Sequence, residues 1–203
     1  MDQISESELK AIIEQVVKRT MGGQISPVSP TPPALIPNEP KISPLILPVI
    51  EKKKTAAIGA DHGGFDLKEI LKKDLMEMGI EVIDCGTSNK EACDYPDFAL
   101  KVAQLVGEGK AEMGIMIDGA GIGSCMVANK VPGVRAAMCY DYSTAVNSKE
   151  HNDANILTLG AGLIGISLAK QILKIWVTTE FGGGRHAKRI EKIVSVEKQY
   201  LKG

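Results

Sequence analysis

The chain has 203 residues, of which 44% are hydrophobic and 24% are charged, and its formal net charge is −1. This composition is that of an ordinary globular protein, and the charge gives no reason to expect nucleic acid or an anionic membrane as a partner. No apolar run approaches the roughly 18 residues of a membrane span, and acidic residues stand near the N-terminus where a secretory signal is basic. The sequence therefore predicts a cytoplasmic protein.

Residues 1–23 have the pattern of a short amphipathic helix. Ser5 and Glu8 form a capping box, and Gly22-Gly23 marks the C-terminal end. Six apolar residues share one stripe: Ile4, Leu9, Ile12, Ile13, Val16 and Val17. A lone helix of about 15 residues is marginal in water, so this stripe needs a partner surface. We expect residues 1–23 to be a docking element.

Residues 24–53 form a separate, proline-rich segment. It holds eight of the ten prolines of the chain: Pro27, Pro30, Pro32, Pro33, Pro37, Pro40, Pro44 and Pro48. Such a segment is an extended linker that builds neither a helix nor a central strand. A short amphipathic helix followed by a Pro-rich linker resembles the encapsulation peptides of bacterial microcompartment enzymes, which implies a shell protein as partner and the microcompartment lumen as location. Two alternatives stay open: the helix folds back on its own domain, or it mediates dimerisation.

Residues 54–203 alternate between strand and helix patterns. Apolar runs predict strands at 55–60, 80–85, 113–117, 134–139 and 155–159. Amphipathic segments predict helices at 65–78, 97–106, 124–130, 142–150 and 163–178, with a last helix opened by residues 182–186. This alternation predicts an α/β domain with a five-stranded parallel sheet covered by helices on both faces. Ligands of such a sheet bind outside the carboxyl ends of its strands.

Cysteines and histidines are scattered along the chain. They are Cys85, Cys93, Cys125 and Cys139, and His62, His151 and His186. There is no C-x-x-C pair, so we expect neither a disulfide framework nor a zinc site.

The most informative stretch follows the central predicted strand. Asp118 stands at the carboxyl end of that strand, and Gly119, Gly121 and Gly123 follow in alternate positions. Glycines let a backbone pass close to a ligand, and the helix start behind them offers unpaired N–H groups that favour an anion. The spacing is G-x-G-x-G and not the G-x-G-x-x-G of a dinucleotide fingerprint, so a nicotinamide cofactor is not expected.

Other polar motifs are expected at the same edge of the sheet. They are Asp61-His62-Gly63-Gly64, Asp94-Tyr95-Pro96, His151-Asn152-Asp153 and Gly182-Gly183-Gly184-Arg185-His186. Arg185 and Arg189 are four residues apart and share a helix face. Two arginines at a helix start are unfavourable for the helix dipole, which favours an interpretation as a phosphate site over a solvated basic face.

These motifs resemble those of the ribose-5-phosphate isomerase B family, whose wider membership includes the galactose-6-phosphate isomerase subunits. The resemblance covers residues 54–203 and rests on Gly59 to Gly64, Asp94-Tyr95-Pro96, Gly119 to Gly123 with Ala128-Asn129-Lys130, His151-Asn152-Asp153 and Gly183 to His186. It implies a Rossmann-like αβα sandwich that works as a homodimer, or as a tetramer, with its sites at the subunit interface. It also implies a metal-free aldose–ketose isomerisation of a phosphorylated sugar, without a cofactor.

The residues fit that chemistry. Moving a carbonyl between C1 and C2 needs a base near the C2 proton and donors for the enediolate oxygen, and Asp118 and the backbone N–H groups of residues 119–123 can supply them. The resemblance implies that His151 is the proton donor and helps to open the sugar ring. It implies substrate contacts by Asp61 and Asn152 at sugar oxygens, by His62, Arg185 and Arg189 at the phosphate, and by Tyr95, Gly119, Ala120, Gly121, Ile122 and Gly123.

Three positions depart from the family pattern. The usual catalytic cysteine falls at Asp118, the threonine that commonly assists it at Ala120, and an arginine often found after the last strand at Gly162. A carboxylate is a competent enediol base, so we interpret Asp118 as a replacement base. The loss of one arginine suggests a substrate other than ribose 5-phosphate, such as a four-carbon or deoxy sugar phosphate.

A second function stays open beside the isomerase. Asp118 and Ala120 together are compatible with a catalytically silent sugar-phosphate binder or structural cargo protein. A third hypothesis, a nucleotide-binding regulator, lacks the fingerprint that it requires.

Overall fold

The computed structural model describes residues 53–200. Five strands form one all-parallel sheet in the order β2-β1-β3-β5-β4. The strands are β1 (Thr55–Ala60), β2 (Glu81–Asp84), β3 (Met113–Asp118), β4 (Ala136–Met138) and β5 (Ile156–Gly160). The predicted five-stranded parallel sheet of a Rossmann-like αβα sandwich is confirmed. The predicted helix at 1–23, and the linker at 24–53 except for its last residue, lie outside the described residues.

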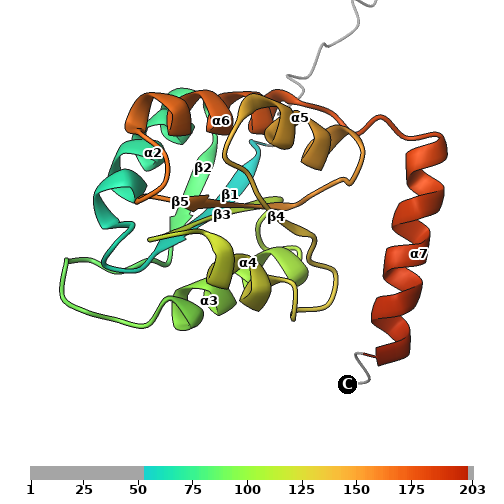
Figure 1. Ribbon diagram of the computed structural model, residues 1–203, viewed down its shortest axis with the longest axis horizontal. Helices are drawn as coiled ribbons and strands as arrows, with labels where there is room; N and C mark the ends of the chain where they lie inside the picture. The colour runs from blue at the N-terminus through green and yellow to red at the C-terminus, as the bar shows by residue number, and fades with distance from the viewer. Residues whose placement is uncertain (1–52, 201–203) are drawn as a thin grey trace, which may run out of the picture. The chain divides into compact units, whose positions relative to one another are not determined.

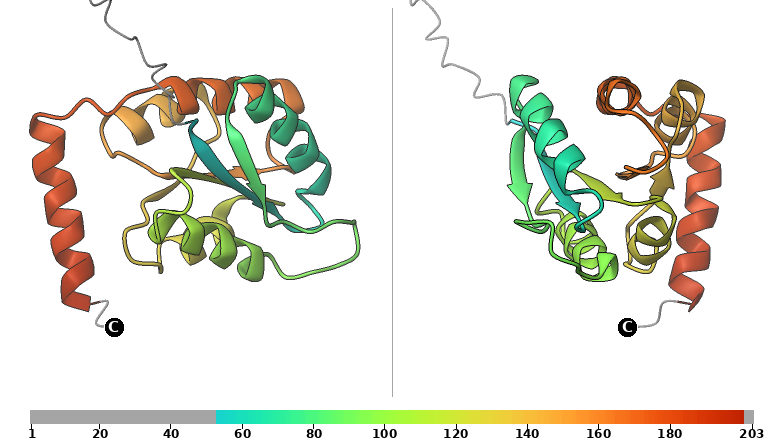
Figure 2. Two further views of the ribbon diagram at one scale, coloured as in Figure 1. Left: turned by 180° about the vertical axis from the view of Figure 1, so that it is seen from behind. Right: turned by 60° about the vertical axis from the view of Figure 1, so that its left-hand side comes forward.

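Six helices of the described range flank or follow this sheet (Figure 1). They are α2 (Phe65–Glu77), α3 (Tyr95–Gly107), α4 (Ile122–Ala128), α5 (Tyr142–Glu150), α6 (Ile166–Thr178) and α7 (Arg185–Tyr200), with the break between α6 and α7 spanning residues 179–184. Helices α2, α5 and α6 cover one face and α3 and α4 cover the other, which the two views of Figure 2 also show. The described part of the chain contains no helix that is both long and apolar enough to cross a membrane.

The sheet lies between two layers of helices because its middle strands are apolar on both faces. Every residue of β3 and β5 is buried, whereas the edge strands β2 and β4 are half-exposed. One hydrophobic cluster lies under α2, α5 and α6 and contains the fully buried Trp176, and a second lies under α3 and α4. Near-continuous apolar runs are the pattern of strands that are buried on both sides.

The predicted element boundaries agree with the structure to within a few residues. Helix α4 begins at Ile122, two residues before the predicted start, because Gly121 already caps it. Helix α6 begins at Ile166 instead of residue 163, because Leu163 and Ile164 donate to the carbonyl of Gly160 and form a turn. Local turn hydrogen bonds of this kind decide helix starts more finely than apolar periodicity does.

An ion-pair cluster ties α2 to the edge strand β2. Lys68, only 2% exposed, donates to both carboxylate oxygens of Asp84 at 2.9 and 2.8 Å. Lys72 reaches Asp84 at 2.7 Å, and both lysines contact Glu69. Burial raises the pKa of Asp84, but the hydrogen bonds from the two lysines outweigh it and the net shift is downward.

Candidate active site

The carboxyl ends of β1 and β3 lie side by side and carry the first group of predicted site residues. Ala60 pairs with Ile117, and Asp118 pairs with Gly160 at the end of β5. Asp61 therefore follows β1 directly beside the loop that begins at Asp118. We call Asp61, His62, Tyr95 and residues 118–123 the carboxyl-edge group.

The carboxylate of Asp118 is 4% exposed and is bonded within its own loop. Its Oδ1 accepts from the backbone N–H of Ala120, at 2.7 Å, and of Gly121. Its Oδ2 accepts from the N–H of Ser124, at 3.2 Å, and from the hydroxyl of Ser124. Asp118 lies at the strand end as predicted, but its carboxylate caps the start of α4. Of the N–H groups of residues 119–123 that we predict as enediolate donors, those of Ala120 and Gly121 already donate to Asp118.

Two glycines of this loop lie so close to other residues of the domain that a side chain would not fit. Gly121 has φ +79°, and a Cβ there would lie 2.9 Å from the carbonyl carbon of Leu159. A Cβ on Gly123 would lie 2.5 Å from the hydroxyl oxygen of Tyr95. Gly119 differs, because a Cβ there would meet nothing within 4 Å. Of the three, Gly119 is the one that borders open space.

Asp61 and His62 complete the carboxyl-edge group. Asp61 is 7% exposed, and its Oδ1 accepts from the backbone N–H of Gly64 at 3.0 Å. The ring Nδ1 of His62 lies 3.2 Å from both the N and the O of Cys93, in the loop that leads to Tyr95. The structure thus brings Asp61, His62, Tyr95 and the Asp118 loop together, as predicted.

The remaining predicted residues lie at the opposite edge of the sheet. Helix α5 runs back from the carboxyl edge, so His151, which caps its C-terminal end, lies near the amino end of β5. The start of α7 is tied to the same place, because Gly182 N–H donates to Glu150 O at 2.9 Å. We call His151, Asn152, Arg185 and Arg189 the helix-end group. The prediction that all motifs gather at one edge is wrong, since residues that precede a parallel strand lie at its amino end.

His151 is held by Asn147 and His186, to which the sequence motifs assign no role of their own. Its ring is stacked on that of His186, with centroids 4.1 Å apart and an interplanar angle of 6°. Its Nδ1 lies 2.8 Å from Nδ2 of Asn147. The i, i+4 spacing of Asn147 and His151 on a helix is the sequence signal that could have identified this contact.

His186 is buried, and its Nδ1 has no hydrogen-bond partner among the described residues. Burial lowers the pKa of His186 below its ordinary value, and the nearby charges of His151 and Arg185 act in the same direction. The ring therefore favours the neutral form.

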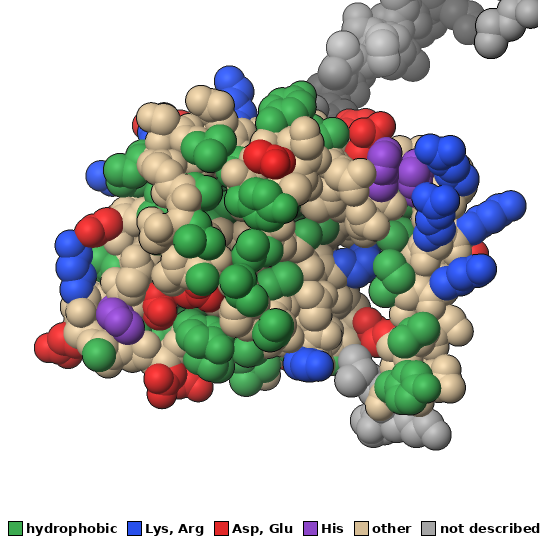
Figure 3. Space-filling view, in the orientation of Figure 1, with side chains coloured by type: hydrophobic (Ala, Val, Ile, Leu, Met, Phe, Trp, Pro, Cys, Tyr) green, Lys and Arg blue, Asp and Glu red, His purple; other side chains and the backbone are tan. Residues whose placement is uncertain are grey.

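Arg185 and Arg189 are exposed at the start of α7. Nε of Arg185 donates to Nε2 of His186 at 3.5 Å, and neither arginine forms an ion pair within residues 53–200. Figure 3 shows basic side chains gathered beside histidines at this end of the molecule. Unpaired guanidinium groups are suited to an anion such as a phosphate.

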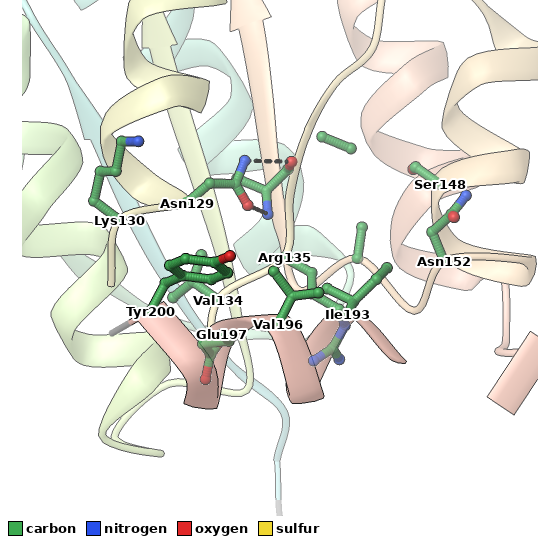
Figure 4. A pocket seen from close by; sticks show the side chains of 13 residues that line it. Asn129, Lys130, Val134, Arg135, Ser148, Asn152, Ile193, Val196, Glu197 and Tyr200 are labelled. Carbon is green, nitrogen blue, oxygen red and sulfur yellow. Dashed lines mark hydrogen bonds between the residues drawn. The ribbon is translucent and has the colours of Figure 1, made fainter. Parts of the chain in front are cut away.

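A hollow separates α7 from the rest of the domain. It has a volume of about 590 Å³ and is mostly apolar, with the lining residues Asn129, Lys130, Val134, Arg135, Ala136, Ala137, Ser148, Asn152, Ala154, Ile193, Val196, Glu197 and Tyr200. Figure 4 shows Ile193, Val196 and Tyr200 on α7 beside Val134 and Arg135. These three α7 side chains are exposed by 47%, 57% and 74%.

No group of three or more histidine, cysteine, aspartate or glutamate residues between 53 and 200 is arranged to hold a metal ion.

Known proteins similar to this chain are sugar isomerases. Residues 56–193 match the family model described as Ribose/Galactose Isomerase. The chain is 42% identical over 146 residues to ribose-5-phosphate isomerase B of Escherichia coli, covering 72% of this chain and 98% of that protein. It is 42% identical over 144 residues to D-erythrulose-4-phosphate isomerase of Pectobacterium atrosepticum, covering 70% and 95%. The solved ribose-5-phosphate isomerase B of Clostridium thermocellum has a TM-score of 0.71 and 51% identity, covering 72% of this chain and 99% of that one.

Proposed function

The chain belongs to the ribose/galactose isomerase family, and we propose that it interconverts the aldose and ketose forms of a phosphorylated sugar through an enediolate. Its enzyme class, an aldose–ketose isomerase, follows from that family. The observation that carries the proposal is the complementary chemistry of the two groups. One offers carboxylates in a glycine loop, and the other offers a histidine beside two unpaired arginines.

Asp118 is the proposed base. Its carboxylate accepts two hydrogen bonds at each oxygen from its own loop, which fix its position at the carboxyl end of β3. The enediolate oxygen is assigned to the N–H groups of Gly119 and Ile122, for which the described residues provide no acceptor. His151 is the proposed proton donor, and Asp61 and Asn152 contact sugar oxygens.

Two copies of the chain are needed to complete this site. The carboxyl-edge group and the helix-end group lie at opposite edges of one sheet, so a single domain cannot bring Asp118 and His151 to one sugar. We propose a homodimer in which the helix-end group of one subunit meets the carboxyl-edge group of the other. The apolar hollow beside α7, with exposed Ile193, Val196 and Tyr200, supports a second copy as its occupant.

Arg185 and Arg189 are the proposed phosphate ligands, with His62 from the other subunit. Gly162 has no side chain to add a further cation, and its N–H donates to the carbonyl of Gly119 at 3.0 Å. This hydrogen bond joins the loop after β5 to the loop after β3, and a site between closely joined loops suits a short substrate. Among the similar proteins, one acts on D-erythrulose 4-phosphate, and we extend a four-carbon sugar phosphate to this chain as the first substrate to test.

Turnover of four- to six-carbon aldose and ketose phosphates tests the function directly. The screen is run in deuterated water, so that proton exchange at C1 or C2 is seen by NMR even where net conversion is slow. We expect exchange with at least one sugar phosphate and none with its unphosphorylated sugar.

The non-catalytic alternative has one observation in its favour, which is the complete hydrogen bonding of the Asp118 carboxylate. A silent binder would bind a sugar phosphate, which raises the melting temperature of the protein, but it would not exchange any proton of the sugar with the solvent. The same deuterium experiment therefore separates the two functions.

Targeting to a microcompartment is a proposal about residues 1–23, which the proline-rich linker separates from the enzyme domain. Residues 1–23 fused to a fluorescent protein should form puncta in a host that produces shells. Diffuse fluorescence of that fusion contradicts the proposal, as does unchanged packaging of the full chain after Ile12→Glu and Val16→Glu.

A further inference from the structure

Three contacts, one to the backbone and two between side chains, determine which ring nitrogen of His151 carries the proton. The first is made by Asn152, whose Nδ2 donates to the backbone carbonyl of Asn147 at 3.1 Å. A carbonyl oxygen can only accept, so this contact fixes which end of the Asn152 amide is the nitrogen. The same nitrogen lies 3.1 Å from Oδ1 of Asn147 and donates to it.

The second contact fixes the amide of Asn147. Because its Oδ1 accepts from Asn152, its Nδ2 is the atom that faces His151, at 2.8 Å from the ring Nδ1. An amide nitrogen can only donate, so Nδ1 of His151 must accept. In a neutral imidazole the proton then resides on Nε2.

His186 supports this arrangement from the side. Its parallel ring at 4.1 Å restricts rotation of the His151 ring, and its own burial disfavours a second positive charge in the stack. The other charged groups around the pair are Glu150, whose carboxylate lies 3.9 Å from Nε2 of His151, and Arg185 and Arg189 on α7.

We propose that Asn147 is a positioning residue that fixes His151 as the Nε2–H tautomer, with the ring of His186 as its stacking support. Neutral His151 then donates a hydrogen bond from Nε2–H to a substrate oxygen, while Nδ1 stays bonded to Asn147. The inference rests on the proposed function, because that function supplies the substrate oxygen to which Nε2–H of His151 donates. Asn152, predicted from the sequence as a sugar ligand, has its amide nitrogen engaged in the same chain of contacts and keeps only Oδ1 for a ligand.

The test replaces the donor opposite Nδ1 with an acceptor of the same shape. Asn147→Asp should move the proton of neutral His151 from Nε2 to Nδ1, because a carboxylate accepts where the amide donated. Two-bond proton–nitrogen NMR spectra of the imidazoles distinguish the tautomers at about pH 9, where histidine is neutral. The chain has three histidines, so each imidazole signal is assigned by replacing one histidine at a time and observing which signal disappears. Ser143→Asp, exposed on the same helix, adds the same charge away from His151 and should leave the tautomer unchanged.

Kinetics give the second readout. With the proton on the wrong nitrogen, Asn147→Asp should lower kcat about 100-fold, at the lower end of the range that general acid–base groups contribute, while KM changes little. Ser143→Asp should keep the wild-type kcat. If the wild type turns over no sugar phosphate, the proposed function fails but the NMR result still decides the tautomer. Wild-type His151 with Nδ1–H, or an unchanged tautomer in Asn147→Asp, overturns the inference whatever the activity.

Discussion

The carboxyl-edge group and the helix-end group hold their functional side chains in different ways. At the carboxyl edge, Asp61 and Asp118 are more than nine-tenths buried and bonded to the backbone of their own loops. At the helix end, Arg185 and Arg189 are exposed and have no carboxylate partner within the described residues. The difference indicates that the first group is preorganised by folding, whereas the second would be ordered by the phosphate and the second subunit that we propose.

The largest expected effect comes from the most firmly held side chain. Asp118→Asn keeps the shape but removes the base, so kcat should fall about 10²- to 10⁴-fold while substrate still binds. It also places an amide nitrogen against N–H donors of the loop, so thermal unfolding should move to lower temperature. Steady-state kinetics and calorimetry measure the two effects.

Ser124→Ala is the matched control for Asp118→Asn. It removes the hydroxyl that donates to Oδ2 but leaves the carboxylate in place, so stability should drop and chemistry should largely remain. Near wild-type turnover in Asp118→Asn, with strong loss in Ser124→Ala, assigns the base to another residue.

At the helix end the expected effect is on binding. Arg189→Ala removes a charge-assisted contact to phosphate worth on the order of 1.5–3 kcal/mol, which is about a 10- to 150-fold rise in KM. Inhibition by inorganic phosphate should weaken in parallel. Lys188→Ala, an exposed neighbour on the same helix, should change neither value. Equal wild-type activity on the unphosphorylated sugar contradicts the phosphate site.

Substitutions of two glycines in the Asp118 loop should have different effects, one on packing and the other on ligand binding. A Cβ on Gly123 would collide with the ring of Tyr95, whereas a Cβ on Gly119 meets open space. Gly123→Ala should therefore lower the free energy of unfolding by about 1–3 kcal/mol. Gly119→Ala should leave stability within about 0.5 kcal/mol and raise KM, because the new methyl group enters the space beside the proposed enediolate donor. Denaturant titration and steady-state kinetics on both variants measure these effects. A loss of stability in Gly119→Ala and a raised KM in Gly123→Ala would contradict the roles given to the two glycines.

The smallest expected effect is a pH dependence of stability from His186. Its pKa is lowered in the folded state relative to 6.5 in the unfolded chain, so below about pH 6.5 the unfolded chain binds the proton first and the free energy of unfolding falls. Above that pH the group contributes nothing. His186→Phe keeps a flat ring and removes the titration, so its stability should change less between about pH 5 and 8. Equal slopes for both proteins contradict the burial of His186 as the cause.

The sequence predicts the sheet well because its strands are buried apolar runs, and the carboxyl-edge group follows from the ends of β1 and β3. It does not predict where the carboxylate of Asp118 points, because that depends on the left-handed conformation of Gly121, which turns two N–H groups toward it. The sequence also places His151 at the wrong edge of the sheet. Helix α5 runs from the carboxyl edge to the amino edge, so a residue at its C-terminal end lies at the amino edge. The sequence assigns no role to Asn147 or to His186, because the role of each arises only from its contact with His151.

If each site combines the carboxyl-edge group of one subunit with the helix-end group of another, mixing two differently inactivated subunits restores activity. Asp118→Asn and His151→Ala are each expected to be nearly inactive. Unfolded together and refolded, they should form about half mixed dimers with one intact site each, which gives about a quarter of wild-type activity. Should Asp118→Asn retain activity, Asp61→Ala takes its place. Activity that stays at the level of the separate variants, although mixed dimers are detected by mass spectrometry, contradicts the shared site.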